Sequence, residues 1–123
     1  MLTGQTALIV EEEFLIALDI QRMLEALGVG RALFARTPAE AEQLRARWPE
    51  VALAVVEVRT GDAPALALAE SLVTAGIPTV LITADIDAQH GIVGMLTLPV
   101  VIKPIPEKDM AMAIRRALSA RLG

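Results

Sequence analysis

Acidic, hydroxyl and amino side chains follow four of the apolar runs in this sequence. Glu11 and Glu12 come directly after the first run, Glu57 follows the third, Thr83 ends the fourth, and Lys103 follows the fifth. Carboxylates held close together repel one another unless a cation lies among them, and Mg²⁺ prefers carboxylate and carbonyl oxygens. An ammonium group and a hydroxyl beside such an ion are suited to bind phosphoryl oxygens. These residue types predict a site for Mg²⁺ and a phosphoryl group if the fold brings the strand ends together.

Each of these residues also has a plainer structural interpretation. Glu11 and Glu12 could begin a solvated helix, where acidic residues suit the positive end of the helix dipole. Glu57 could be an ordinary polar residue where a strand reaches the surface, and Lys103 could mark the exit of the last strand. Thr83 is the weakest indicator, because threonine is common in strands. Their joint position at four strand ends favours the functional interpretation.

Short apolar runs alternate with segments of helical periodicity along the whole chain. Continuous apolar runs are typical of strands buried on both faces, and apolar residues three and four apart are typical of amphipathic helices. The predicted strands are 6–10, 32–35, 51–56, 79–82 and 99–102, and the predicted helices are 14–27, 38–48, 65–75 and 107–122. The pattern within 85–95 is ambiguous. Thr37, Pro38 and Glu40 form a helix start with a capping-box pattern, and this helix should end before Pro49.

This alternation predicts an α/β fold of the (βα)5 type, a doubly wound three-layer sandwich with a parallel five-stranded sheet. No internal repeat or linker interrupts it, so we expect residues 1–123 to form a single domain without an output domain. In such sheets ligands bind beyond the carboxyl ends of the strands, near the point where the strand order reverses. The polar residues described above follow those ends.

Composition excludes several classes of function. The chain has 123 residues, is 54% hydrophobic, and carries a net charge of −4, which argues against binding nucleic acid through a basic surface. It has no cysteine, so thiolate zinc sites and thiol nucleophiles are absent. No apolar run approaches the 18 or so residues of a membrane span, and the N-terminus does not resemble a signal peptide. We therefore expect a soluble, cytoplasmic protein that binds neither nucleic acid nor membranes.

Four short motifs in this order resemble the response-regulator receiver domains, the CheY-like family. They are ALIVEEE at 7–13, VVEV at 55–58, IPTVLITA at 77–84 and IKPI at 102–105. The resemblance covers nearly the whole chain. It implies the flavodoxin-like strand order 2-1-3-4-5, a cis peptide bond before Pro104, and a role in two-component signal transduction rather than as an enzyme.

The resemblance also assigns roles to the strand-end residues. In the family, the acidic pair after the first strand holds Mg²⁺, and those positions are Glu11 and Glu12 here. The acid at the end of the third strand accepts a phosphoryl group from a histidine kinase and shares the metal; here it is Glu57, and the backbone carbonyl of Arg59 would complete the ligands. Thr83 and Lys103 would bind the phosphoryl oxygens.

Three departures from the family pattern change these expectations. Glu12 and Glu57 replace aspartates, and each extra methylene moves the carboxylate by roughly 1.3 Å. At position 57 the shift would bring the carboxylate toward the place of a phosphoryl group and toward Lys103. A displaced nucleophile should react poorly, because in-line attack tolerates little misplacement. Val100 stands where many receivers carry an aromatic switch residue.

Two positions resemble residues that flank the phosphorylation site in the family. Arg59 lies two residues after Glu57, and Asp85 lies two residues after Thr83. Arg59 could bridge to Asp85 across the mouth of the pocket. Alternatively, it could turn inward and neutralise the glutamates in place of a metal ion.

Our leading hypothesis is a stand-alone receiver-like module that acts without normal aspartyl phosphorylation, with Glu57 as a fixed acidic mimic of the phosphorylated state. Mg²⁺ binding would then be weak or absent. Its partner would be a histidine kinase or another signalling protein.

Two alternatives remain open from the sequence. In the first, Glu57 is a working, Mg²⁺-dependent phosphoacceptor. In the second, the domain is a structural dimerisation module with a relic pocket, and two copies pair through the face formed by the fourth helix, the fifth strand and the fifth helix.

Overall fold

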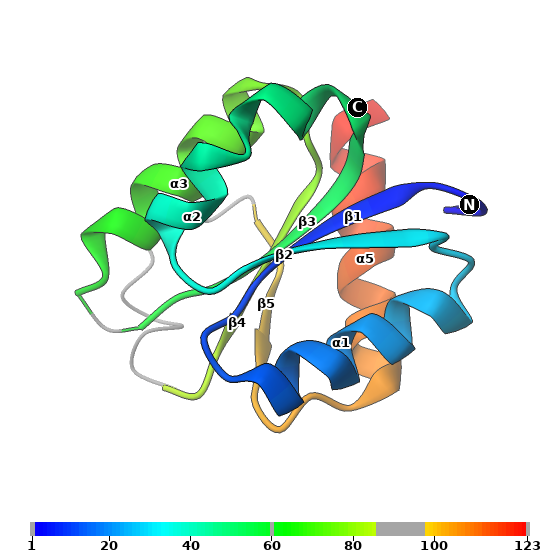
Figure 1. Cartoon of the computed structure of the whole chain (residues 1–123). Helices are drawn as coiled ribbons and strands as arrows, with labels where there is room; N and C mark the ends of the chain where they lie inside the picture. The colour runs from blue at the N-terminus through cyan, green and yellow to red at the C-terminus, as the bar shows by residue number, and fades with distance from the viewer. Residues whose placement is uncertain (1, 60, 86–97, 123) are drawn as a thin grey trace.

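A computed structural model of the chain describes residues 2–59, 61–85 and 98–122. Strands and helices alternate in it from residue 6 to residue 83, as the apolar pattern predicts (Figure 1). Its elements are β1 Thr6–Val10, α1 Phe14–Ala26, β2 Arg31–Ala35, α2 Pro38–Gln43, the 3-10 helix η1 Arg45–Glu50, β3 Val51–Glu57, α3 Ala63–Thr74, β4 Thr79–Thr83, β5 Val100–Ile102 and α5 Glu107–Leu122. The ambiguous segment at 85–95 lies, apart from Asp85, outside the described residues.

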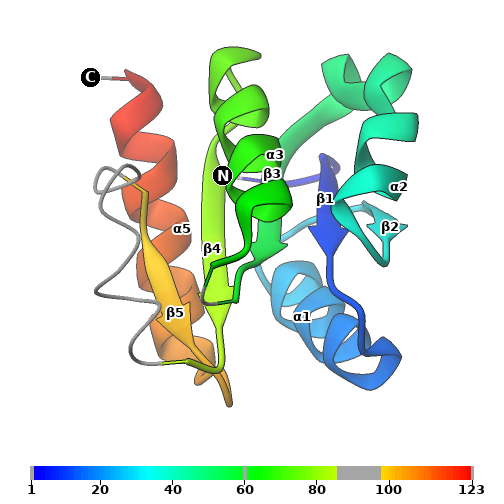
Figure 2. The same ribbon diagram turned by 90° about the vertical axis from the view of Figure 1, so that its left-hand side faces the viewer.

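The five strands form one parallel sheet in the order β2-β1-β3-β4-β5, which confirms the predicted fold class. The central strands β1, β3 and β4 are buried on both faces, as is typical of parallel sheets whose strands are joined by crossovers. In the register, Val10 is the partner of Val56, and Thr83 is the partner of Ile102. The strands therefore end at nearly the same level, at one edge of the sheet (Figure 2).

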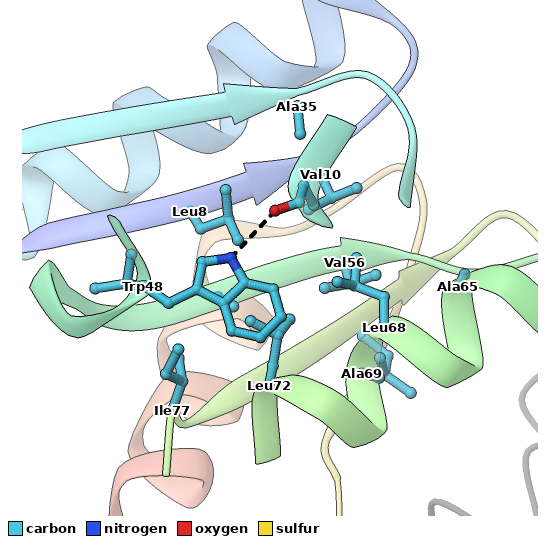
Figure 3. Close-up of a cluster of buried hydrophobic side chains, with 14 of the residues drawn as sticks. Leu8, Val10, Ala35, Trp48, Val56, Ala65, Leu68, Ala69, Leu72 and Ile77 are labelled. Carbon is cyan, nitrogen blue, oxygen red and sulfur yellow. Dashed lines mark hydrogen bonds between the residues drawn. The ribbon is translucent and has the colours of Figure 1, made fainter. Parts of the chain in front are cut away.

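Alternation along the strands separates the core into two layers. In β1, Ala7 and Ile9 pack with α1 and α5, whereas Leu8 and Val10 pack with α2 and α3 on the opposite face. Figure 3 shows part of the second layer, in which Leu68 and Leu72 of α3 lie beside Val56 of β3. Helices cover both faces of the central strands, and the site lies at the ends of these strands.

The segment before β3 differs from the prediction of one helix running to about Trp48. The α-helix α2 ends at Gln43, and the 3-10 helix that follows includes Trp48 and Pro49. Pro49 lacks an amide hydrogen and its ring would clash with a carbonyl one helical turn earlier, so the chain tightens instead of continuing as an α-helix. This turn buries Trp48, whose indole Nε1 donates a hydrogen bond to the carbonyl oxygen of Ala41 at 3.1 Å (Figure 3).

The helix-start and helix-stop signals act largely as expected. The Thr37 hydroxyl accepts a hydrogen bond from the Glu40 amide at 3.1 Å, which caps the first turn of α2. Gly28 and Gly76 adopt positive φ angles of 102° and 82° just after α1 and α3, a conformation that favours glycine. None of the helices in the described residues has the length and apolar character needed to cross a bilayer.

Candidate functional site

The polar residues that follow the strands meet at one edge of the sheet. Glu11 follows β1, Glu57 ends β3, Thr83 ends β4, and Lys103 follows β5. In the sheet these four strands lie side by side in the order β1-β3-β4-β5. The peptide bond between Lys103 and Pro104 is cis, as the resemblance implied.

Lys103 lies between two glutamates at the centre of this edge. Its Nζ is 2.6 Å from Glu11 Oε1, and it donates a hydrogen bond to Glu57 Oε2. The Glu11 side chain is fully buried, and the side chains of Glu57 and Lys103 are only 13% and 10% exposed. The second oxygen of Glu11, Oε2, accepts a hydrogen bond from the Glu13 amide at 2.9 Å, which holds this carboxylate in place.

The charge state of Lys103 follows from these contacts. Burial by itself lowers the pKa of a lysine, but the hydrogen bonds and negative charges of Glu11 and Glu57 outweigh it, so the pKa of Lys103 is raised. Lys103 is therefore a fixed cation at physiological pH.

Arg59 supplies a second cation to the same site. Its Nη2 donates a hydrogen bond to Glu12 Oε2 at 2.6 Å and lies 3.6 Å from Glu57 Oε1. The hydrogen bond to Glu12 and the charges of Glu57 and Glu12 raise the pKa of Arg59. This pair lies at the surface, with side chains 60% and 52% exposed. The two oxygens of Glu57 thus face two different cations.

The loop that carries Arg59 is closed by Asp62. The Asp62 amide donates to the Arg59 carbonyl oxygen at 3.1 Å, and the Arg59 amide donates to Asp62 Oδ2 at 3.4 Å. Asp62 also caps α3, because its Oδ1 accepts from the Ala65 amide at 3.2 Å. The sequence analysis missed this cap, which Asp62 and the proline at the second helical position could have indicated. The Arg59 carbonyl, proposed above as a metal ligand, is already engaged in this turn.

Thr83 ends β4 and Val100 begins β5, so their positions follow from the strands of the sheet. Thr83 is fully buried, and its Oγ1 accepts a hydrogen bond from the Asp85 amide at 3.1 Å. Val100 is half-buried and packs against the core layer on the side of α2 and α3. No aromatic side chain stands at this position to link the site to the outer face of the sheet.

Two cavities adjoin the site. The larger, of about 800 Å³, lies beside α1 and is lined by Glu13, Ile16, Asp19, Ile20, Met23, Glu57, Arg59, Thr83, Ala84, Asp85, Lys103, Pro104 and Ile105. The smaller, of about 210 Å³, lies beside α2 and is lined by Val10, Glu12, Arg36, Thr37, Pro38, Glu57, Arg59, Asp62 and Pro64. Glu57 and Arg59 line both cavities. Arg59 and Asp85, which the sequence placed at the mouth, line the larger one together.

The carboxylates are arranged to meet side-chain cations rather than Mg²⁺. Lys103 contacts Glu11 Oε1 and Glu57 Oε2, and Arg59 lies beside the other oxygen of Glu57 and one oxygen of Glu12. Among the residues that the structure describes, no three acidic, histidine or cysteine side chains are grouped to hold a metal ion. Mg²⁺ requires octahedral oxygen coordination. The described donor set, with its oxygens turned to lysine and arginine, does not fit that ion.

No family model matches the chain, and no curated protein matches it in sequence. Solved structures do match it in fold. A response-regulator receiver domain protein from Clostridium thermocellum superposes with a TM-score of 0.76 at 17% identity, over 95% of this chain and 96% of that one. The receiver domain of the response regulator PhyR from Erythrobacter litoralis gives 0.74 at 19% identity, over 95% and 92%.

A third match points to the same fold. The signal receiver domain of an HD domain-containing protein from Pseudomonas fluorescens Pf-5 gives a TM-score of 0.75 at 24% identity, over 95% of this chain and 96% of that one. Together with the strand order, these matches show that the chain has the receiver fold, also called CheY-like.

Proposed function

We propose that this chain is a receiver-like signalling module that contacts partner proteins without depending on phosphorylation. The observation that carries the proposal is the contact between Glu57 and Lys103. A glutamate at the end of β3 reaches the lysine that, in the receiver family, binds a phosphoryl oxygen. The site thus holds an anion against that lysine permanently.

The position of Glu57 also speaks against efficient phosphoryl transfer. One oxygen of Glu57 is hydrogen-bonded to Lys103, and the other lies 3.6 Å from Arg59 Nη2. Both oxygens of Glu57 are therefore occupied by side chains of the chain itself. Attack on phosphorus also requires an in-line approach that a displaced side chain does not meet. We therefore propose no catalytic activity for the chain.

Exposed apolar side chains support a role in protein contacts. Phe14 and Leu15 begin α1, directly after the acidic residues, and are 70% and 75% exposed. Met112 on α5 is 51% exposed. The partner we propose is a histidine kinase or another signalling protein. Pairing of two copies through the outer face of β5 and α5 is the alternative; the fourth helix of that face falls outside the described residues.

Intact-mass spectrometry after incubation with acetyl phosphate and Mg²⁺ tests the proposal. We expect no added phosphoryl group on the wild-type protein. Glu57→Asp shortens the side chain by one methylene and is the matched variant, and Glu57→Gln removes the nucleophile and is the negative control. A phosphoryl group on the wild type, absent from Glu57→Gln, would overturn the proposal and make Glu57 a working acceptor.

Binding of a partner protein is tested separately. Pull-down with the wild-type protein as bait identifies the partner, and Glu57→Gln is then compared with it. Loss of the negative charge releases Lys103 from Glu57, so we expect binding to weaken by about tenfold if the mimic sets the contact surface. Unchanged binding would favour the dimerisation alternative, which size-exclusion chromatography with light scattering checks directly.

A further inference from the structure

The three glutamates of the site are neutralised in part by two cations of the chain itself. Glu11, Glu12 and Glu57 carry three negative charges, and Lys103 and Arg59 carry two positive ones. The two cations are not equivalent, because Lys103 is nearly buried whereas Arg59 is 60% exposed and reaches the glutamates from outside. Arg59 is thus the outer of the two charges.

Arg59 reaches the glutamates from a loop that is held by hydrogen bonds. The loop between β3 and α3 is closed by hydrogen bonds in both directions between the backbone of Arg59 and Asp62. Arg59 lies only two residues beyond Glu57, yet it bridges to Glu12, which is 47 residues away in sequence. Its side chain also lines both cavities that adjoin Glu57. An ion that approached Glu12 and Glu57 together would therefore meet the guanidinium group.

We infer that Arg59 is a built-in replacement for a divalent cation and keeps Mg²⁺ out of this site. The inference rests on the proposed function, and it adds the reason why the glutamates remain without a metal ion. A guanidinium group supplies positive charge and directed N–H donors to two carboxylates, and it repels a second cation through the same charge. Removal of Arg59 takes away the cation that contacts Glu12 and leaves Glu57 with Lys103 alone, so the variant should acquire an affinity for divalent cations.

The test is a titration of the purified protein with Mn²⁺. Isothermal calorimetry measures the binding, electron paramagnetic resonance measures the free Mn²⁺, and added Mg²⁺ competes for the same site. We compare the wild type with Arg59→Ala and with Arg59→Gln, which keeps more of the side chain. Removing one unit charge beside a divalent ion should tighten Mn²⁺ binding by at least about tenfold in both variants. Circular dichroism establishes that each variant is folded.

Arg36→Ala is the matched control. Arg36 lines the smaller cavity beside Glu12 and carries the same charge, but in the described part of the chain it makes no ion pair with Glu12 or Glu57. We expect its Mn²⁺ affinity to stay within about twofold of the wild type, because the lost charge is not in contact with the carboxylates. The double variant Glu12→Gln/Arg59→Ala should bind Mn²⁺ no more tightly than the wild type, because one of the two carboxylates has become neutral.

One result overturns the inference: Mn²⁺ binding by Arg59→Ala and Arg59→Gln that is no tighter than binding by the wild type. No phosphodonor is present in the titration, so its outcome is separate from that of the phosphorylation test. A wild type that takes up a phosphoryl group yet binds no Mn²⁺ would reject the proposed function and keep the role of Arg59.

Discussion

The ammonium group of Lys103 is held between the carboxylates of Glu11 and Glu57, with its Nζ 2.6 Å from Glu11 Oε1. This arrangement joins the ends of three strands, because Glu11 follows β1, Glu57 ends β3 and Lys103 follows β5. A nearly buried ammonium group is tolerated only because two carboxylates neutralise it and one of them, Glu57, accepts a hydrogen bond from it. The contact is therefore a structural feature of the sheet edge as well as a candidate functional one.

Lys103→Met should destabilise the protein by about 3 kcal/mol, because it leaves two glutamates near the interior without their cation. Urea denaturation followed by Trp48 fluorescence measures the free energy of unfolding. Lys108→Met is the matched control, because Lys108 is exposed on α5, and its loss should change stability by less than about 0.5 kcal/mol. Equal effects of the two substitutions would contradict a special role for Lys103.

The raised pKa of Lys103 predicts a loss of stability at alkaline pH. The pKa in the folded state lies above the ordinary value of 10.5, so the folded protein holds this proton more tightly than the unfolded chain does. The resulting stabilisation is fully present below pH 10.5 and is lost as the pH rises through the folded-state value. The difference in unfolding free energy between the wild type and Lys103→Met should therefore shrink above pH 10.5. A constant difference up to pH 12 would show that the charge of Lys103 is not responsible.

Arg59→Ala should change the free energy of unfolding much less than Lys103→Met does, because exposed ion pairs are screened by solvent and contribute little. Thermal and urea denaturation at low and high salt measure this change. A small effect separates the proposed role of Arg59 in excluding cations from a role in folding. A loss as large as that of Lys103→Met would instead make Arg59 a structural residue.

Trp48→Phe should destabilise the protein by about 0.5 to 1.5 kcal/mol, because the carbonyl oxygen of Ala41 loses the indole Nε1 and keeps only the Leu44 amide as a donor. Trp48→Ala should cost about 3 to 5 kcal/mol, since it also leaves a cavity in the layer beneath α3. Circular dichroism follows unfolding of both variants, which lack the fluorescent reporter. If the two variants were equally stable, the contribution of the aromatic ring to packing would be refuted.

The sequence by itself determined most of the strands and helices and the edge of the sheet at which the site lies. Continuous apolar runs such as 6–10 and 51–56 are typical of strands covered on both faces, and such strands favour a parallel sheet with helical crossovers. The position of Glu57 or Lys103 at a strand end follows directly from where an apolar run stops. Local hydrogen bonds such as the Thr37 cap were also readable, because both partners lie within four residues.

Only the tertiary structure decided which charges meet. Glu57 and Lys103 are 46 residues apart, and Arg59 and Glu12 are 47 apart, so their distances depend on strand order and register rather than on any local pattern. The sequence left Arg59 free to bridge to Asp85 or to turn toward the glutamates, and the structure brings it within 2.6 Å of Glu12. The end of α2 was decided in the same way: burial of Trp48 against the sheet, with its hydrogen bond to Ala41, favoured a 3-10 turn over the continuous helix that periodicity predicted. Long-range contacts of this kind arise only when the chain packs, because each side chain there takes the partner that the fold places within reach.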